Sequence, residues 1–379
     1  MMAKLGDIAT YINGYAFKPQ DWSDEGIPII RIQDLTGNSY QANRYNGEYA
    51  SKYEVNDGDV LISWSASLGV YIWHGEKAVL NQHIFKVVFD KERISKDFFV
   101  HQVGLILENA ASDAHGATMK HLTKPVFDAL PFYLPPYEKQ CEIAEVLDKV
   151  TSLISLRKQQ LAKLDELVKA RFVEMFGDVL LNSMQWPEKT LENMADIVSG
   201  ITKGRKTAEA DLQEVPYMAV SNVKDGYIDW TTVKTILATR QEIEQYRLMP
   251  DDILMTEGGD PDKVGRGAII KVPLKNSIHQ NHIFRVRLDE QEILPSFFAE
   301  YLRHQKAKRY FLGCAKQTTG IASINMRQLR ALPTLVPPLS LQKQFAAFVE
   351  RVDRQKQTIQ QSLEKLELMK KALMQEYFG

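Results

Sequence analysis

The chain has 379 residues, of which 25% are charged, and its formal net charge at pH 7 is −1. This length exceeds one ordinary domain, and the near-zero charge argues against a strong autonomous nucleic-acid binder. No apolar run approaches the roughly 20 residues of a membrane-spanning helix, and the two cysteines show no metal-ligand spacing. We therefore expect a cytoplasmic protein of two domains without disulfides.

In chain order, residues 1–134 carry short strand patterns rich in Val, Ile, Tyr and Phe, broken by Gly, Asn and Asp. A helix is predicted near Lys96–Glu108 and another near Pro295–Arg309, and each is followed by a loop that contains Gly and Thr. Long helices are predicted after both globular segments. The predicted domains are therefore 1–134 and 178–334, and the helical segments are 135–177 and 335–379.

Short motifs in the two globular segments repeat in the same order, while the loops between them differ in length and chemistry. Constant strands with varying loops are expected where loops carry recognition and the scaffold carries stability. The matched pairs are Leu5–Gly14 with Leu191–Gly200, Ile27–Ile30 with Val215–Met218, Asp59–Ser63 with Asp252–Thr256, and Asn81–Val87 with Gln280–Val286.

The two long helical segments also repeat each other, because Pro135–Gly177 aligns with Pro337–Gly379 without a gap. Each begins with Pro-Pro and ends with Phe-Gly, which are residues suited to a helix start and stop. Apolar residues recur every seven positions, which predicts that the helices pair along a coiled-coil seam. The predicted seam residues are Leu147, Ile154, Leu161 and Val168 in the first helix and Val352, Ile359, Leu366 and Leu373 in the second.

These patterns predict an α+β fold with pseudo-twofold symmetry. Two similar mixed α/β domains would be separated by a long antiparallel pair of helices. A helix of this length would leave an apolar stripe in water if it stood alone, so we expect pairing between the helices rather than packing of each on its own domain.

No catalytic motif is present. Leu134–Tyr137 resembles the Pro-Pro-aromatic loop of amino-methyltransferases, but that loop needs Asp, Asn or Ser where Leu134 stands. Lys203–Thr207 contains parts of a phosphate loop without the complete G-x-x-x-x-G-K-[ST] pattern. Asp260–Lys263 lacks the spacing of a nuclease site. We therefore expect a chain that is not an enzyme.

Local basic clusters occur at matching places in both halves. The segment from Arg303 to Arg330 contains no acidic residue, and neither does Ala114–Phe127. Their recurrence in loops rich in Gln, Thr and Ser favours DNA, with Lys and Arg on phosphates and amide or hydroxyl groups at base edges. The candidate DNA-binding residues are Lys120, His121, Lys124, Lys203, Arg205, Lys206, Lys263, Arg266, Lys316, Gln317, Thr318, Thr319, Asn325 and Arg327.

The doubled, ordered set of motifs resembles the specificity (S) subunits of Type I restriction–modification systems. The helix starts Gln140–Ala144 and Gln342–Ala346 carry this resemblance together with Asp59–Ile62, Asn81–Phe85 and their second copies. It covers nearly the whole chain. The resemblance implies that each globular segment is a target recognition domain that reads one half of a bipartite double-stranded DNA sequence, while the helices set the spacer and dock two methyltransferase (M) subunits.

The resemblance further implies that this chain holds no cofactor. S-adenosylmethionine would bind the M subunits, and ATP and Mg²⁺ would bind two restriction (R) subunits where these are present. Two alternatives remain open from the sequence. One is an S-like recognition subunit of a related restriction or phage-defence system. The other is a coiled-coil protein scaffold that does not bind DNA, which the recurring basic clusters disfavour.

Overall fold

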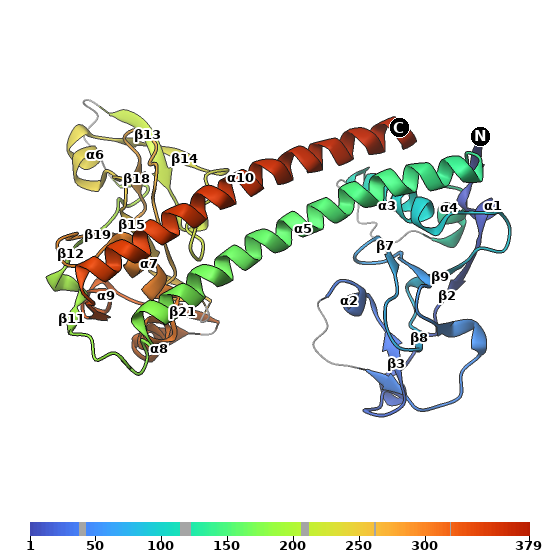
Figure 1. Cartoon of the computed structure of the whole chain (residues 1–379), viewed down its shortest axis with the longest axis horizontal. Helices are drawn as coiled ribbons and strands as arrows, with labels where there is room; N and C mark the ends of the chain where they lie inside the picture. The colour runs from blue at the N-terminus through green and yellow to red at the C-terminus, as the bar shows by residue number, and fades with distance from the viewer. Residues whose placement is uncertain (38–42, 114–122, 206–211, 261–262, 319) are drawn as a thin grey trace. The chain divides into compact units, whose positions relative to one another are not determined.

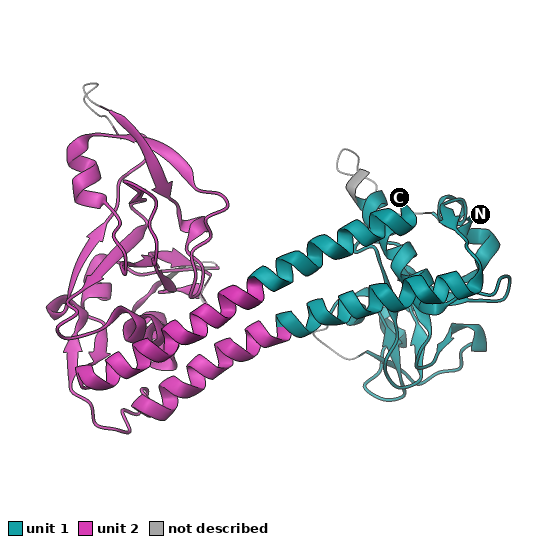
Figure 2. Ribbon diagram, turned by 45° about the horizontal axis from the view of Figure 1, so that its top comes forward, with its two compact units in different colours: residues 1–158, 361–379 teal, residues 159–360 magenta. Residues whose placement is uncertain are grey.

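The structure is a computed structural model that describes residues 1–37, 43–113, 123–205, 212–260, 263–318 and 320–379 (Figure 1). Its contacts divide the chain into two compact units (Figure 2). Unit 1 comprises Met1–Lys158 with Gln361–Gly379, and unit 2 comprises Gln159–Gln360. The two long helices, α5 (Tyr137–Phe176) and α10 (Leu339–Phe378), therefore contribute residues to both units.

Among its described residues, unit 1 contains two four-stranded sheets and one two-stranded ribbon. The antiparallel sheet has the order β2 (Thr10–Asn13), β9 (Ile84–Val88), β6 (Val60–Ser63), β7 (Gly69–Ile72); the mixed sheet has the order β4 (Arg44–Tyr45), β3 (Ile27–Ile30), β8 (Ala78–Leu80), β5 (Glu54–Val55), and β1 (Met2–Lys4) pairs with β10 (Pro131–Tyr133). Its shorter helices are α1 (Leu5–Ile8), α2 (Ile32–Leu35), α3 (Lys96–Asp113) and α4 (Lys124–Asp128), with 3-10 turns at Pro19–Asp21 and Ser51–Tyr53.

Unit 2 repeats this strand order, except that its mixed sheet has three strands in the described residues and lacks a counterpart of β5. Its antiparallel sheet runs β12 (Ala195–Ser199), β19 (Ile283–Leu288), β15 (Ile253–Thr256), β17 (Gly267–Ile269); its mixed sheet runs β14 (Lys234–Ala238), β13 (Gln213–Met218), β18 (Ile278–His279), and β11 (Glu188–Thr190) pairs with β22 (Pro333–Leu335). A further sheet joins β16 (Gly258–Gly259), β21 (Ile321–Ser323) and β20 (Lys316–Thr318). The helices are α6 (Arg240–Tyr246), α7 (Pro295–Arg303), α8 (Gln305–Cys314) and α9 (Met326–Arg330), with 3-10 turns at Leu191–Asn193 and Val220–Asn222.

A close backbone approach explains why a glycine recurs in the first repeated motif. A Cβ on Gly14 would lie 2.0 Å from the carbonyl oxygen of Asn81, and one on Gly200 would lie 1.9 Å from that of His279. In each unit the next residue forms a parallel bridge to the strand end it approaches, Tyr15 to Asn81 in unit 1. Only glycine fits such a contact.

The long helices run antiparallel, as predicted, because the contacts move back along α10 as they advance along α5. In unit 1, Arg157 Nε donates to Ser362 Oγ at 3.2 Å. In unit 2, Lys356 Nζ donates to Asp165 Oδ1 at 2.6 Å. Both basic residues interrupt the apolar seam, and each has a polar partner on the facing helix. Gly177 ends α5 with φ +74° and donates its N–H to Val173 at 2.8 Å.

The ends of both helices pack into the globular cores, so pairing and packing on a domain both occur. Leu147 is fully buried in the core of unit 1, and Val168 and Val352 are buried in that of unit 2. Leu373 is half-buried against the unit 1 core. The remaining predicted seam residues are half-buried along the helices: Ile154, Leu161, Ile359 and Leu366.

The helix predicted near Pro295–Arg309 is broken in two. α7 ends at Arg303, and His304 adopts an extended backbone (φ −87°, ψ 162°) before α8 begins at Gln305. The His304 ring stacks on Phe172 of α5 at 4.5 Å between centroids. Packing against α5 therefore accompanies a bend that residue propensities alone do not indicate.

A buried glutamine holds the start of each long helix. Gln140 Oε1 accepts from Ser95 N at 3.0 Å, and its Nε2 donates to Pro135 O at 2.9 Å. Gln342 repeats this pattern with Leu294 N at 2.8 Å and Pro337 O at 2.8 Å. The Pro-Pro-x-x-x-Gln spacing shared by the two repeats therefore has a structural role, because the glutamine fixes the start of each long helix.

Candidate nucleic-acid interface

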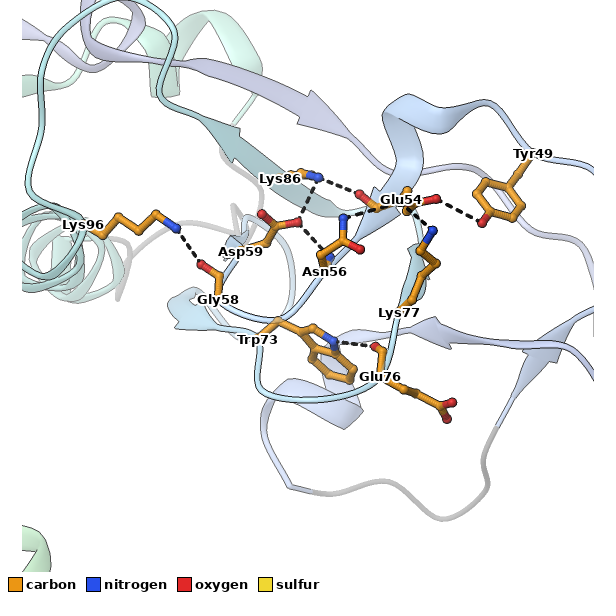
Figure 3. A network of polar contacts seen from close by, with 10 residues as sticks. All are labelled: Tyr49, Glu54, Asn56, Gly58, Asp59, Trp73, Glu76, Lys77, Lys86 and Lys96. Atoms are coloured by element: carbon orange, nitrogen blue, oxygen red, sulfur yellow. Dashed lines mark hydrogen bonds and ion pairs between the residues drawn. The ribbon is translucent and has the colours of Figure 1, made fainter.

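The repeated aspartates are scaffold residues. Asp59 Oδ2 accepts from Asn56 N at 2.8 Å and pairs with Lys86 at 2.8 Å (Figure 3). Its counterpart Asp252 caps the same kind of turn, and Arg287 donates to both of its carboxylate oxygens at 2.7 and 2.9 Å. These carboxylates are occupied in holding a turn against a strand.

Part of the basic run in unit 2 is neutralised by acidic residues that lie outside the run, one of them nearby in the sequence and two far away. Arg303 donates to Glu300 Oε2 at 3.2 Å. Lys306 lies 2.5 Å from Glu188 Oε2, and Lys308 lies 4.0 Å from Asp225. Within this run, the exposed basic residues for which the described part of the chain provides no ion pair are Arg309, Lys316, Arg327 and Arg330.

Arg205 is engaged within unit 2. Its Nε and Nη2 donate to the two carboxylate oxygens of Glu242 at 2.5 and 2.6 Å, and Nη2 also donates to Leu237 O at 3.1 Å. This charged fork lowers the pKa of Glu242 to about 2. Glu242 also closes the capping box of α6 with Thr239. Arg205 thus fixes the loop before β13 to α6, while neighbouring Lys203 is exposed.

Three further candidates have partners within their own unit. Asn325 Oδ1 accepts from Gln328 N at 3.0 Å and caps α9. Lys263 pairs with Asp260. In unit 1, Lys124 Nζ lies 2.6 Å from Asp128 Oδ2. The side chain of Asn325 serves as a helix cap, and the two lysines are exposed on the surface with a neighbouring acid.

The structure brings several candidates of unit 2 to one small sheet. Lys316 begins β20, whose strand also contains Gln317 and Thr318, and β20 pairs with β21. β21 pairs on its other side with Gly258–Gly259, beside which the Lys263 side chain lies. Arg266 joins this region through its carbonyl, which accepts from Thr256 N at 3.1 Å. Lys120, His121, Lys206 and Thr319 lie outside the described residues.

Unit 1 has a cavity of about 310 Å³ where the parallel strands β3 and β8 end. It combines two aromatic rings, one guanidinium and several amides. The lining residues are Phe17, Trp22, Arg31, Ile32, Gln33, Asn81, Gln82 and His83. Sequence reasoning missed Arg31 and Gln33 because they stand outside any basic run. The sequence feature that could have indicated them is their position directly after the repeated strand motif Ile27–Ile30.

Within the described ranges, no cluster of three or more His, Cys, Asp or Glu side chains could hold a metal ion. In the same residues no helix is both long and apolar enough to cross a membrane.

Comparison with protein families decides the identity of the scaffold. Residues 1–166 and 184–368 match the Type I restriction modification DNA specificity domain. The chain belongs to this family. It therefore has two target recognition domains on a specificity-subunit scaffold, and specificity subunits are the non-catalytic members of Type I complexes.

Curated relatives of this family are similar over most of the chain. The Type I restriction enzyme EcoBI specificity subunit of Escherichia coli is 23% identical over 379 residues, covering 92% of this chain and 78% of the relative. The EcoKI specificity subunit of Escherichia coli (strain K12) is 20% identical over 398 residues, covering 96% and 84%. The MjaVIII specificity subunit of Methanocaldococcus jannaschii is 23% identical over 403 residues, covering 98% and 90%.

Solved structures of the family share the fold. The crystal structure of the Type I S subunit from M. genitalium aligns with a TM-score of 0.55 at 16% identity, covering 100% of this chain and 96% of that one. A second structure, described in terms of complex assembly and conformational transition of the type I system, gives 0.54 at 14% identity, covering 100% and 97%. At these identities the likeness concerns the fold alone.

Proposed function

We propose that each target recognition domain of this specificity subunit recognises one half of a bipartite double-stranded DNA sequence. The observation that carries the proposal is the repeated scaffold with unequal side chains. The two units share their strand order and their glycine contact. Yet Arg31 and Gln33, which follow β3, correspond to Ala219 and Ser221 after β13. Two similar domain scaffolds that carry different polar side chains suit a DNA target whose two halves differ in sequence.

A domain exchange tests this proposal. Residues 178–334 are replaced by the matching segment of another family member, and the complex with its M subunits is used to methylate random DNA. Sequencing of the methylated sites should show one half-site changed and the other retained. A change in both halves would contradict separate recognition, and so would methylation without sequence preference by the unaltered complex.

We further propose that α5 and α10 set the number of unread base pairs between the half-sites. Each helix has 40 residues, which corresponds to about 60 Å at 1.5 Å per residue. Antiparallel pairing and burial of both ends in the domain cores would make this length a stiff connection. The test by insertion is developed in the Discussion.

The docking surface for M subunits is proposed to lie on the side of α5 that this chain leaves uncovered. The predicted seam residues Leu147 and Val168 are buried by the chain itself. The large apolar side chains of α5 that are exposed are instead Val146, Leu153, Leu156, Leu167 and Val173. Val146, Leu153 and Leu167 fall at multiples of seven residues, so they share one stripe of the helix. S-adenosylmethionine would be bound by these M subunits, and ATP with Mg²⁺ by R subunits where present.

DNA binding by the isolated chain should be weak, because its net charge of −1 gives little attraction for phosphates. We expect tight, specific binding only when M subunits add their own contacts. Titration of labelled target DNA with the chain alone and with the assembled complex measures this difference. Nanomolar binding by the chain alone at physiological salt would contradict it.

A further inference from the structure

The cavity of unit 1 lies beside strands that are firmly held. Its back wall includes Phe17, which is 7% exposed and packs edge-on against Tyr15 and Tyr45 at 4.9 and 5.0 Å between ring centroids. Asn81 N donates to Ile30 O at 3.1 Å, which ties one wall to the end of β3. The cavity is thus a preformed feature of the domain.

Arg31 presents its charge to this cavity without a carboxylate partner in the described residues. Its guanidinium carbon lies 5.1 Å from the centroid of the Trp22 ring, whose side chain is 44% exposed. Its backbone N–H is held by Asp34 Oδ2 at 2.8 Å. The stacked ring and the fixed backbone together restrain a guanidinium whose planar donors suit two-pronged hydrogen bonding at this cavity.

Two side-chain amides beside Arg31 are also available. Gln33 and Gln82 make no side-chain hydrogen bond to any residue that the structure places. Gln82 is positioned through its backbone, which donates to Tyr15 O at 2.8 Å. Next to it, His83 has φ +72°, a conformation that non-glycine residues rarely adopt and that often accompanies a functional site.

The corresponding place in unit 2 has the same backbone support but other side chains. Asn222 Oδ1 accepts from Ala219 N at 2.9 Å, as Asp34 does from Arg31. The cavity-lining side chains Arg31 and Gln33 of unit 1 are therefore replaced by Ala219 and Ser221 in unit 2. Structural residues would be retained, whereas groups that distinguish two half-sites would differ.

We propose that this cavity is a base-recognition subsite of the first target recognition domain, in which Arg31 donates to O6 and N7 of a guanine and Gln33 or Gln82 contacts the neighbouring base edge. A base edge is favoured over a phosphate because amides offer both donors and acceptors, and a phosphate would use only the donors. The inference rests on the proposed recognition of one half-site by each domain.

The experiment compares the unaltered chain with Arg31→Ala, Arg31→Lys and the control Arg93→Ala, each assembled with M subunits. Arg93 is a suitable control because it also stacks on an aromatic ring, with its guanidinium carbon 4.0 Å from the Tyr137 centroid. Competition binding against a library with every single base change in the target measures discrimination at each position. The domain exchange identifies which half-site belongs to unit 1.

We expect Arg31→Ala and Arg31→Lys to lose roughly 5- to 150-fold discrimination for guanine at one position of the unit 1 half-site. Lysine keeps the charge but loses the two-pronged donor geometry, so a loss in both variants separates base recognition from simple attraction. The other half-site and the Arg93→Ala variant should be unchanged. A uniform loss of affinity across all sequences would assign Arg31 to a phosphate and overturn the inference, as would unchanged discrimination in both Arg31 variants. If the unaltered complex itself shows no sequence preference, the proposed function fails instead.

Discussion

Both long helices pass from one unit to the other, α5 between Lys158 and Gln159 and α10 between Gln360 and Gln361. A change of spacer length therefore requires the same insertion in both helices. Four helix-forming residues placed after Lys158 and four after Gln360 would add about 6 Å to each helix. They would return the apolar seam to within about 40° of its original direction, since each residue turns the helix by about 100°.

Each base pair advances roughly 3.4 Å along DNA. The double insertion should therefore lengthen the unread spacer by one or two base pairs and leave both half-site sequences unchanged. Sequencing of DNA methylated by the variant complex reads the spacer and the half-sites in one assay. The unaltered complex provides the reference spacer.

The matched control carries the insertion in α5 alone. The pair Arg157–Ser362 and the pair Lys356–Asp165 lie on opposite sides of the insertion point, so the facing helices could not keep both registers. Displacing three half-buried seam side chains at about 1 kcal/mol each would cost about 3 kcal/mol, which is a large part of the stability of an ordinary domain. This variant should melt at a markedly lower temperature. An unchanged spacer in a well-folded double-insertion variant would refute the proposal that the two helices set the distance between the half-sites. Contacts with the M subunits would then have to set that distance.

Three stability predictions test the scaffold by thermal and denaturant unfolding. Gly200→Ala should destabilise the protein by at least about 3 kcal/mol because the new Cβ would overlap the carbonyl of His279. The control is Gly313→Ala in α8, where a new Cβ would meet no atom within 4 Å, so this variant should be neutral or stabilising. Gln342→Ala should lower the free energy of unfolding by roughly 2–5 kcal/mol because it removes the hydrogen-bond partner of one backbone N–H and two backbone carbonyls. Lys343→Ala, on the exposed side of the helix, should change this free energy little. Burial lowers the pKa of His279 to about 4. Below about pH 6.5 the unfolded chain therefore binds a proton at this imidazole that the folded chain does not bind. The free energy of unfolding should consequently fall as the pH is lowered from about 6.5 to 4. His279→Leu should flatten this part of the pH curve, and an equally steep curve in the variant would assign the loss to other groups.

The fold was predicted from periodicity and repetition in the sequence. The matched motifs correspond to equivalent strands in the two units, and the segments with seven-residue apolar spacing form a pair of antiparallel helices. A helix or strand is specified by neighbours in sequence, so a local pattern suffices. The break at His304 escaped prediction because its packing partner, Phe172, lies on another helix.

The candidate site was harder to predict, because charge in sequence does not indicate which charges are already paired. Arg205 was chosen for its basic neighbours, yet its partner Glu242 stands far along the chain. Arg31 was overlooked because no basic run surrounds it, although no carboxylate among the residues that the structure describes pairs with its guanidinium. The DNA-contact assignments of Lys203, Lys316 and Arg327 remain predictions.

The packing of the end of α10, including half-buried Phe378, against unit 1 has a consequence for the order in which the domains can form during synthesis. Its ring packs on Phe98 at 5.4 Å between centroids, and Leu373 and Tyr377 lie against the same core. Unit 2 is one continuous segment and has all its residues once Gln360 has been made. The first domain on the chain also draws on residues made more than two hundred positions later, so unit 2 has all its residues before unit 1 does.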